Sequence, residues 1–263
     1  MVIRCDQKLH SRFKFRWAYQ KVRYCLSRPN RKSILLFGLN KSGTTAALRL
    51  IAKSSASSYF DDFPYFLGGW EDVLAGKKSP DEYFFANKHA FSRDIIRFPI
   101  DQRSFELAND FFELSSFIVT VRNPIENIKS ILSRLRIPGD RDSIEPEVIA
   151  SFHPEWRAMF SRRSNYIDSL IDCWVDAYQT ERWVSDPNAV LFRYEDFLAD
   201  KNAYIKRKVE QLGLRAQNTI SADVDRQFQP AGSKMPNDIF FGKNLDRIAD
   251  RTRLVACKFG YAI

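Results

Sequence analysis

The sequence predicts a three-layer α/β/α fold built on a central, mostly parallel sheet. Three apolar runs are too short for helices and carry the residue types that buried parallel strands use: residues 34–37, 117–121 and 189–192. A helical segment follows each run, and the first run leads directly into a glycine-containing loop. This repeated order places helices on the sheet faces and a ligand site at the carboxyl ends of the strands.

Other segments complete the predicted organisation. Residues 83–86 are interpreted as a fourth strand, and residues 136–146 as a surface loop. Residues 166–178 form a predicted helix whose apolar side chains recur at helical spacing and are interpreted as a core face. Residues 8–27 form a second predicted helix, with apolar side chains on more than one side.

Charge divides the chain of 263 residues into two predicted parts. Residues 1–32 hold ten basic side chains against one acid, so the whole net charge of +9 lies in this segment. We interpret residues 1–32 as a basic helical extension and residues 33–263 as a single domain. A charge-balanced domain argues against a nucleic-acid partner. The extension can pack across the domain or contact an anionic membrane, and both alternatives stay open.

Cysteines and hydropathy point to a cytoplasmic protein, with membrane contact limited to the periphery. The four cysteines are far apart, with no paired spacing and no neighbouring histidine, which favours free thiols over zinc ligands or a disulfide framework. The longest apolar runs are far shorter than the roughly 20 residues that cross a bilayer. The first residues also lack the apolar stretch of a signal peptide.

The loop after the first predicted strand is a candidate anion site. It reads GLNKSGTT over residues 38–45 and leads into a helix rich in alanine and leucine. This order directs backbone N–H groups and the positive end of the helix dipole at one point. Gly43 permits close backbone approach, and Lys41 supplies a mobile charge. The added hydroxyl donors are Ser42, Thr44 and Thr45.

This loop departs from the phosphate loop of nucleoside triphosphatases, GxxxxGK[ST]. Here Thr44 follows Gly43, and the lysine lies two positions before that glycine. KSGTT after an apolar strand resembles the 5′-phosphosulfate loop of sulfotransferases that use 3′-phosphoadenosine-5′-phosphosulfate (PAPS). The resemblance implies a P-loop-like nucleotide-binding fold. It also implies that the five residues 41–45 bind the donor.

A second motif follows the predicted strand 117–121. Asn123 can cap a helix that begins at Pro124, which builds another helix N-terminus at the same sheet edge. In that helix Ser130 falls on the polar side, opposite the apolar stripe. RNPIENIKS also reproduces the family's spacing of an arginine and a serine at the 3′-phosphate, so the resemblance assigns Arg122 and Ser130 to this role.

Weaker marks of the resemblance lie elsewhere. YFFANKHA is similar to the family's strand that leads to the catalytic histidine, and this assigns His89 as the base, although Asn87 stands where the family often has lysine. RYEDF implies that Tyr194 lies near the adenine, and its two acids are interpreted as structural anchors. The basic loop that binds the 3′-phosphate late in the chain is not recognisable, although Ser233 and Lys234 lie in a suitable region. The closing Gly260 and Tyr261 are also common in the family.

The expected reaction is direct in-line transfer of a sulfuryl group from PAPS to a hydroxyl or amine, leaving 3′-phosphoadenosine-5′-phosphate (PAP). His89 takes the acceptor's proton and Lys41 stabilises the leaving oxygen, with no metal required. Aromatic side chains within residues 59–70 suit a carbohydrate or glycolipid acceptor and equally suit core packing. Two alternatives stay open. One is a P-loop kinase or NTPase with Asp196 as magnesium ligand, and the other is a non-catalytic anion or membrane-surface binder.

Overall fold

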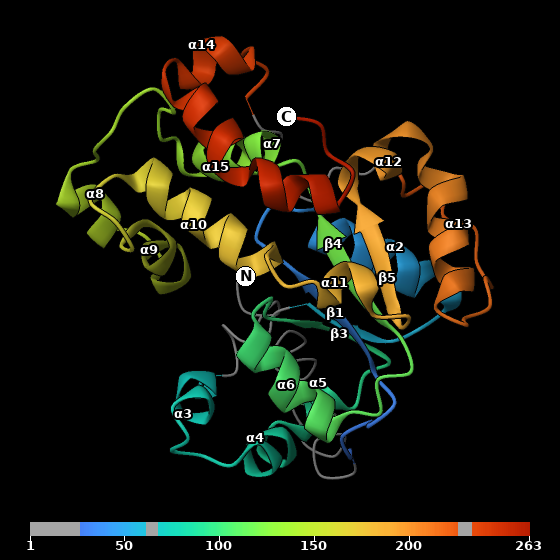
Figure 1. The fold of residues 1–263 in the computed structure, drawn as a ribbon. Helices are drawn as coiled ribbons and strands as arrows, with labels where there is room; N and C mark the ends of the chain where they lie inside the picture. Colours follow the sequence, from blue (N-terminus) through green and yellow to red (C-terminus); the bar gives the residue numbers. More distant parts are fainter. Residues whose placement is uncertain (1–26, 62–67, 226–232) are drawn as a thin grey trace, which may run out of the picture.

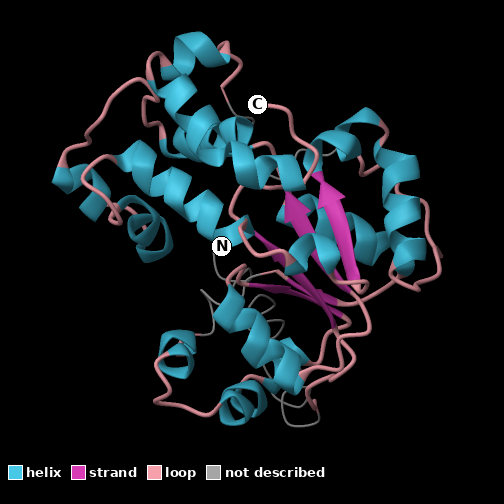
Figure 2. Cartoon of the chain, in the orientation of Figure 1, coloured by secondary structure: helices cyan, strands magenta, loops and turns pink. Residues whose placement is uncertain are grey.

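The computed structural model describes residues 27–61, 68–225 and 233–263, and the predicted helix 8–27 falls almost wholly outside them. A five-stranded sheet runs through the centre of the described part, in the order β2-β3-β1-β4-β5 with every neighbouring pair parallel (Figures 1 and 2). The strands are β1 (Ile34–Gly38), β2 (Tyr59–Phe60), β3 (Ile95–Phe98), β4 (Phe117–Val121) and β5 (Ala189–Arg193).

Helices connect and cover the strands (Figure 1). Those in the first half are α2 (Thr44–Ser55), α3 (Trp70–Leu74), α4 (Pro80–Ala86), α5 (Lys88–Phe91), α6 (Gln102–Phe111) and α7 (Pro124–Leu135). Those in the second half are α8 (Pro146–Ala150), α9 (Pro154–Phe160), α10 (Tyr166–Tyr178), α11 (Arg182–Ser185), α12 (Tyr194–Ala199), α13 (Lys201–Gln211), α14 (Asn237–Phe241) and α15 (Asn244–Lys258). None of the helices in the described ranges is long and apolar enough to span a membrane.

Alternation along the strands builds two cores, which confirms the predicted three layers. Leu36 points to the face covered by α2 and α13, whereas Leu35 and Phe37 point to the opposite face. That second face is covered by α4, α6 and α11 and by the carboxyl ends of α10 and α15. A third core joins α7, α9, α10 and α15 beside the sheet. Both faces of the sheet are therefore shielded from solvent, as expected for strands that are apolar along their whole length.

The second face explains the high phenylalanine content of the sequence. Phe37 contacts four other aromatic rings at centroid distances of 5.3–5.9 Å. Trp70, one of the aromatics considered for an acceptor cleft, is buried here and donates a hydrogen bond from its indole N–H to the hydroxyl of Ser104 at 3.0 Å. Trp70 therefore belongs to the core. Residues 62–67 lie outside the described ranges.

The predicted strand at residues 83–86 is wrong, because these residues form the end of α4. Pro80 occupies the first turn, and Asp81 and Glu82 follow it there. Proline at this position is preorganised for a helix, and acids in the first turn interact favourably with the helix dipole. These local signals outweigh the strand propensity of Tyr83 and the two phenylalanines after it. The strand beside β1 is instead β3, Ile95–Phe98.

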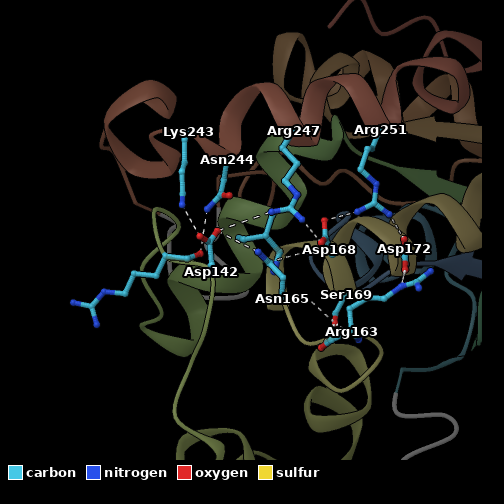
Figure 3. Close-up of polar contacts among 12 residues, drawn as sticks. Asp142, Arg163, Asn165, Asp168, Ser169, Asp172, Lys243, Asn244, Arg247 and Arg251 are labelled. Carbon is cyan, nitrogen blue, oxygen red and sulfur yellow. Dashed lines mark hydrogen bonds and ion pairs between the residues drawn. The ribbon is translucent and has the colours of Figure 1, made fainter.

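An ion-pair network fastens α15 to α10 (Figure 3). Asp168 on α10 accepts from both Arg247 and Arg251 on α15, and Arg251 also reaches Asp172 on α10. Burial alone would raise the pKa of Asp172, but its hydrogen bonds and charge contacts with Arg163 and Arg251 lower it overall. The two helices therefore meet through a shared row of charges above their apolar contact.

Asp168→Asn is expected to lower the free energy of unfolding by about 1–3 kcal/mol, between the values for exposed and buried ion pairs. The side chain of Asp168 is only 15% exposed, and its loss leaves two guanidinium groups without their shared partner. Chemical denaturation measures this change. Asp250→Asn, which breaks an exposed pair with Arg253 on α15, is the control and should change stability by less than about 1 kcal/mol.

Candidate functional site

Three of the predicted site residues follow three strands at one edge of the sheet. Lys41 comes after β1, Arg122 directly after β4, and Tyr194 directly after β5. Because β1, β4 and β5 are neighbours and parallel, their carboxyl ends meet at this edge. The structure thus brings the residues of separate motifs to one place.

The loop between β1 and α2 has an unusual backbone. Lys41 has φ of 69° and Gly43 has φ of 97°, a region that side chains other than glycine rarely adopt. Ser42 fixes the turn by donating to the carbonyl of Leu39 at 2.7 Å and by sharing a 2.8 Å hydrogen bond with the hydroxyl of Thr120 on β4. The strain at Lys41 is therefore held in place by contacts with the sheet.

Side chains from outside the loop take up its remaining carbonyl groups. Asn127 on α7 donates to the carbonyl of Asn40 at 3.1 Å, and Arg122 donates to the carbonyl of Lys41 at 3.3 Å. The carbonyl oxygens of Leu39, Asn40 and Lys41 are therefore all engaged within the protein. This arrangement suits an anion.

Thr44 and Thr45 are the first two residues of α2, so their N–H groups have no carbonyl partner within the helix. Gly43 caps this end, and no side chain supplies a cap hydrogen bond. Ser42 differs from the expectation, because it is fully buried and its hydroxyl is used within the protein. Ser42 therefore positions the loop.

Lys41 is electrostatically prepared for an anion. Burial, then the charges of Arg134 and Arg122, lower the pKa of Lys41 to about 8. Both guanidinium charges therefore lie close enough to disfavour the charged form of Lys41, and such a cluster of like charges is costly unless a negative charge joins it. A multiply charged anion would supply it.

Arg122 joins the loop to the second and third motifs. Its guanidinium carbon lies 4.7 Å from the centroid of the Tyr194 ring, and the same group contacts Lys41 through the carbonyl bond above. A Cβ at Gly43 would come within 2.5 Å of the Tyr194 ring, so only glycine leaves room for that ring. The Nε of Arg122 is buried and has no hydrogen-bond partner among the described residues.

The helix after Arg122 begins as predicted, with Asn123 accepting from two N–H groups of the first turn of α7. Ser130 is buried, only 6% exposed, and so does not lie on a solvent-facing side as expected. It is one helical turn after Glu126 and one turn before Arg134, which places all three on one face. Glu126 pairs with Arg122 at 3.6 Å, so this face meets the loop site. Arg134 was missed, although its spacing from Ser130 is visible in the sequence.

A late segment of the chain lies along α7. Lys129, only 7% exposed, donates to Asn237 at 2.8 Å, and the N–H of Ser233 donates to the hydroxyl of Ser133 at 3.0 Å. These contacts hold the late segment against α7 on both sides of Ser130 in the sequence. They also bring Ser233 and Lys234, the region considered for the 3′-phosphate loop, onto the helix that carries Ser130.

The acids of the RYEDF motif are structural anchors, as predicted. Glu195 accepts from the hydroxyl of Tyr261 at 2.6 Å, and Asp196 pairs with Arg193 at 3.4 Å. Arg193 also donates to the carbonyl of Gly260 at 3.2 Å and lies over the Tyr261 ring. The Gly-Tyr pair near residue 260 thus fastens to the strand end that presents Tyr194.

The assignment of His89 as the base is not supported, because His89 lies before β3 and the loop site lies after β1. On α5, the carbonyl of Phe91 accepts from the N–H of Asn30 at 2.7 Å, and the carbonyl of Arg93 accepts from Ser33 at 2.6 Å. Both contacts are at the amino end of β1, the opposite edge of the sheet. Burial, then the charge of Arg93, lower the pKa of His89. The sequence predicts a strand that leads to this histidine, whereas the residues form α4 and α5 before β3.

No family model and no curated protein matches the sequence. Among solved structures, the chain is similar to mouse sulfotransferase SULT7A1 complexed with PAP, with a TM-score of 0.52, 14% identity, and coverage of 90% of this chain and 91% of that one. It is also similar to the sulfotransferase domain of the olefin synthase of Synechococcus PCC 7002, with a TM-score of 0.51, 13% identity, and coverage of 90% and 97%.

The chain has the sulfotransferase fold. This confirms the predicted P-loop-like α/β/α class. In the sulfotransferase fold of this chain, the strand order brings the KSGTT loop and the RNPIENIKS helix side by side at one edge. What the site binds is a separate question, since likeness at this level of identity concerns the fold.

Sulfate should bind the loop more weakly as the pH rises from 7 to 9. With a pKa of about 8, Lys41 is roughly nine-tenths charged at pH 7 and one-tenth at pH 9. Thermal shifts with sodium sulfate, compared with sodium chloride at equal ionic strength, measure the effect. In Lys41→Met the specific shift should be small and independent of pH. A shift of equal size in that variant at pH 7 would mean that Lys41 does not contact the anion.

Proposed function

We propose that this chain is a sulfotransferase that moves a sulfuryl group from PAPS to a hydroxyl or amine of an acceptor and leaves PAP. The observation that carries the proposal is the contact of Arg122 with both the Lys41 loop and the Tyr194 ring. One nucleotide with a charged group at each end of its ribose would touch both Lys41 and Arg122. The fold, shared with sulfotransferases of known structure, supports the same reading.

In this proposal the residues divide between the two ends of the nucleotide. Lys41 and the N–H groups of Thr44 and Thr45 bind the phosphosulfate, and Lys41 stabilises the oxygen that leaves sulfur. Arg122 and Ser130 bind the 3′-phosphate. The partnerless Nε of Arg122 fits this role, because an arginine fork binds phosphate through parallel hydrogen bonds. Tyr194 lies beside the adenine.

The contacts of Asp196 count against the kinase alternative, which needs this residue as a magnesium ligand. Asp196 is engaged by Arg193, which is itself tied to the carbonyl of Gly260. A divalent ion at Asp196 would have to displace this arginine. The lysine of the loop also lies at a different position from the lysine in the phosphate loop of nucleoside triphosphatases. We therefore favour sulfuryl transfer over phosphoryl transfer.

Finer parts of the proposal concern the acceptor and the setting. We favour a carbohydrate or glycolipid over a small phenol, and a cytoplasmic protein whose cysteines are reduced. Cys173 and Cys257 are free thiols, which fits a reducing compartment. Membrane contact through the basic extension stays a prediction, because residues 1–26 lie outside the described ranges.

PAP should raise the melting temperature more than ATP with magnesium does. A ligand that binds only the folded state at 100 times its Kd stabilises it by about 2.7 kcal/mol. Differential scanning fluorimetry with both ligands at equal concentration tests this. Stabilisation by ATP with magnesium alone would overturn the proposal in favour of the kinase alternative.

Arg122→Lys should weaken PAP binding by about 10- to 100-fold, because a point charge replaces a bidentate fork. Its affinity for adenosine 5′-phosphate, which lacks the 3′-phosphate, should change little. Isothermal titration with both nucleotides separates the two effects. Arg182→Lys, an exposed arginine over Phe105 on the other side of the sheet, is the matched control and should bind both as the native protein does. An equal loss of affinity for the two nucleotides would mean that Arg122 does not bind the 3′-phosphate.

A further inference from the structure

A cavity of about 240 Å³ lies beside the Lys41 loop, between the carboxyl ends of β1 and β3. Asn40, the residue before Lys41, forms part of its wall, and its side chain accepts from Arg97 on β3 at 2.7 Å. The cavity is smaller than the roughly 300–1,000 Å³ that drug-sized ligands fill. It therefore suits the reacting end of an acceptor, one unit that carries a hydroxyl or amine.

We propose that Asp101, on the wall of this cavity, is the general base that takes the acceptor's proton. The inference rests on the proposed sulfotransferase activity. It assigns a base in place of His89, which lies at the opposite edge of the sheet. Asp101 follows β3 by three residues, so it lies at the same edge of the sheet as Lys41. The acceptor would then lie between the sulfuryl group at the loop and the carboxylate at the cavity wall.

The other titratable groups on the wall are less suited to accept a proton. Burial raises the pKa of the Cys173 thiol to about 11, and this thiol donates to the carbonyl of Met159 at 3.6 Å. Cys173 is therefore protonated at neutral pH. Asp176 forms an ion pair with Arg162, and its side chain is 54% exposed. Asp101 forms no ion pair in the part of the chain that the structure describes.

The carboxylate of Asp101 is oriented by one of its two oxygens. Oδ1 accepts from the N–H of Ser104 at 2.7 Å and so caps the N-terminus of α6. Ser104 is fully buried, and its hydroxyl receives the indole N–H of Trp70 from the aromatic core. The second oxygen has no hydrogen bond within the described ranges, so it is available to an acceptor. A carboxylate at this end of a helix also interacts favourably with the helix dipole.

The proposed step is balanced in atoms and charge. Oδ2 of Asp101 takes the proton of the acceptor O–H or N–H while that oxygen or nitrogen forms its bond to sulfur. The bond between sulfur and the bridging phosphate oxygen breaks, and its electron pair remains on the phosphate beside the Lys41 ammonium. The protonated carboxyl then releases its proton to water. Holding the acceptor between two fixed groups favours the in-line geometry.

Asp101→Asn separates this role from capping, since asparagine caps helices as well as aspartate does but is not a base. We expect transfer from radiolabelled PAPS to fall about 10²- to 10⁴-fold. The probes are water, glucose, glucosamine and 4-nitrophenol, each assayed with the full chain. PAP affinity and melting temperature should stay close to the native values. Asp101→Ser, which also keeps a cap, should lose activity in the same way and guards against deamidation of the asparagine.

Asp200 supplies the matched control, because it caps α13 by accepting from the N–H of Ala203 at 3.1 Å. Asp200→Asn should leave transfer and PAP affinity unchanged. Native-like transfer by both variants at position 101 would overturn the assignment while the sulfotransferase proposal stands. If the native chain neither binds PAP nor consumes PAPS, the proposed function fails, and the role of Asp101 fails with it.

Discussion

The site depends on how the backbone of the loop between β1 and α2 is held. Between β1 and α2, carbonyl oxygens are engaged by a serine of the loop itself, by Asn127 on α7 and by Arg122. The left-handed conformation of Lys41 is the cost of this arrangement, and the contacts with β4 and α7 offset it. An anion site assembled in this way is formed before the ligand arrives and needs little reorganisation on binding.

The same contacts set how the rest of the site is arranged. Because Arg122 is tied to the loop, the helix that starts after it is held there, and Ser133 on that helix accepts from the N–H of Ser233. Tyr194 is placed by the end of β5, which Arg193 fastens to the carbonyl of Gly260. Five parts of the chain are therefore held near one another by hydrogen bonds within the protein.

Most of the fold could be predicted from the sequence, because its strongest signals are local. The strands at 34–38, 117–121 and 189–193 and the helix 166–178 follow from apolar runs and helical spacing. The Asn123 cap and the KSGTT loop are equally local. The strand β3 was missed because it has only four residues and includes Arg97. Residues 83–86 were misread because the strand propensity of their aromatics was weighed above Pro80 and the acids after it.

Site residues that depend on packing could not be predicted in this way. The segment that packs on α7 next to Ser133 comes 100 residues later in the chain, and the edge at which His89 lies depends on which segment forms β3. Asp101 gives no catalytic signal in the sequence, where it reads only as a helix cap before α6. Its position beside the loop appears once the parallel pairing of β1 and β3 is known.

The chain of contacts from Trp70 through Ser104 to Asp101 links the aromatic core to the cavity wall. Substitutions at Trp70 that preserve its volume but remove the indole N–H would keep the core full and still loosen the carboxylate. Fewer substitutions are therefore tolerated in this core than packing alone would allow. A substitution that removes one of these hydrogen bonds would change the position of the Asp101 carboxylate in a protein that remains folded.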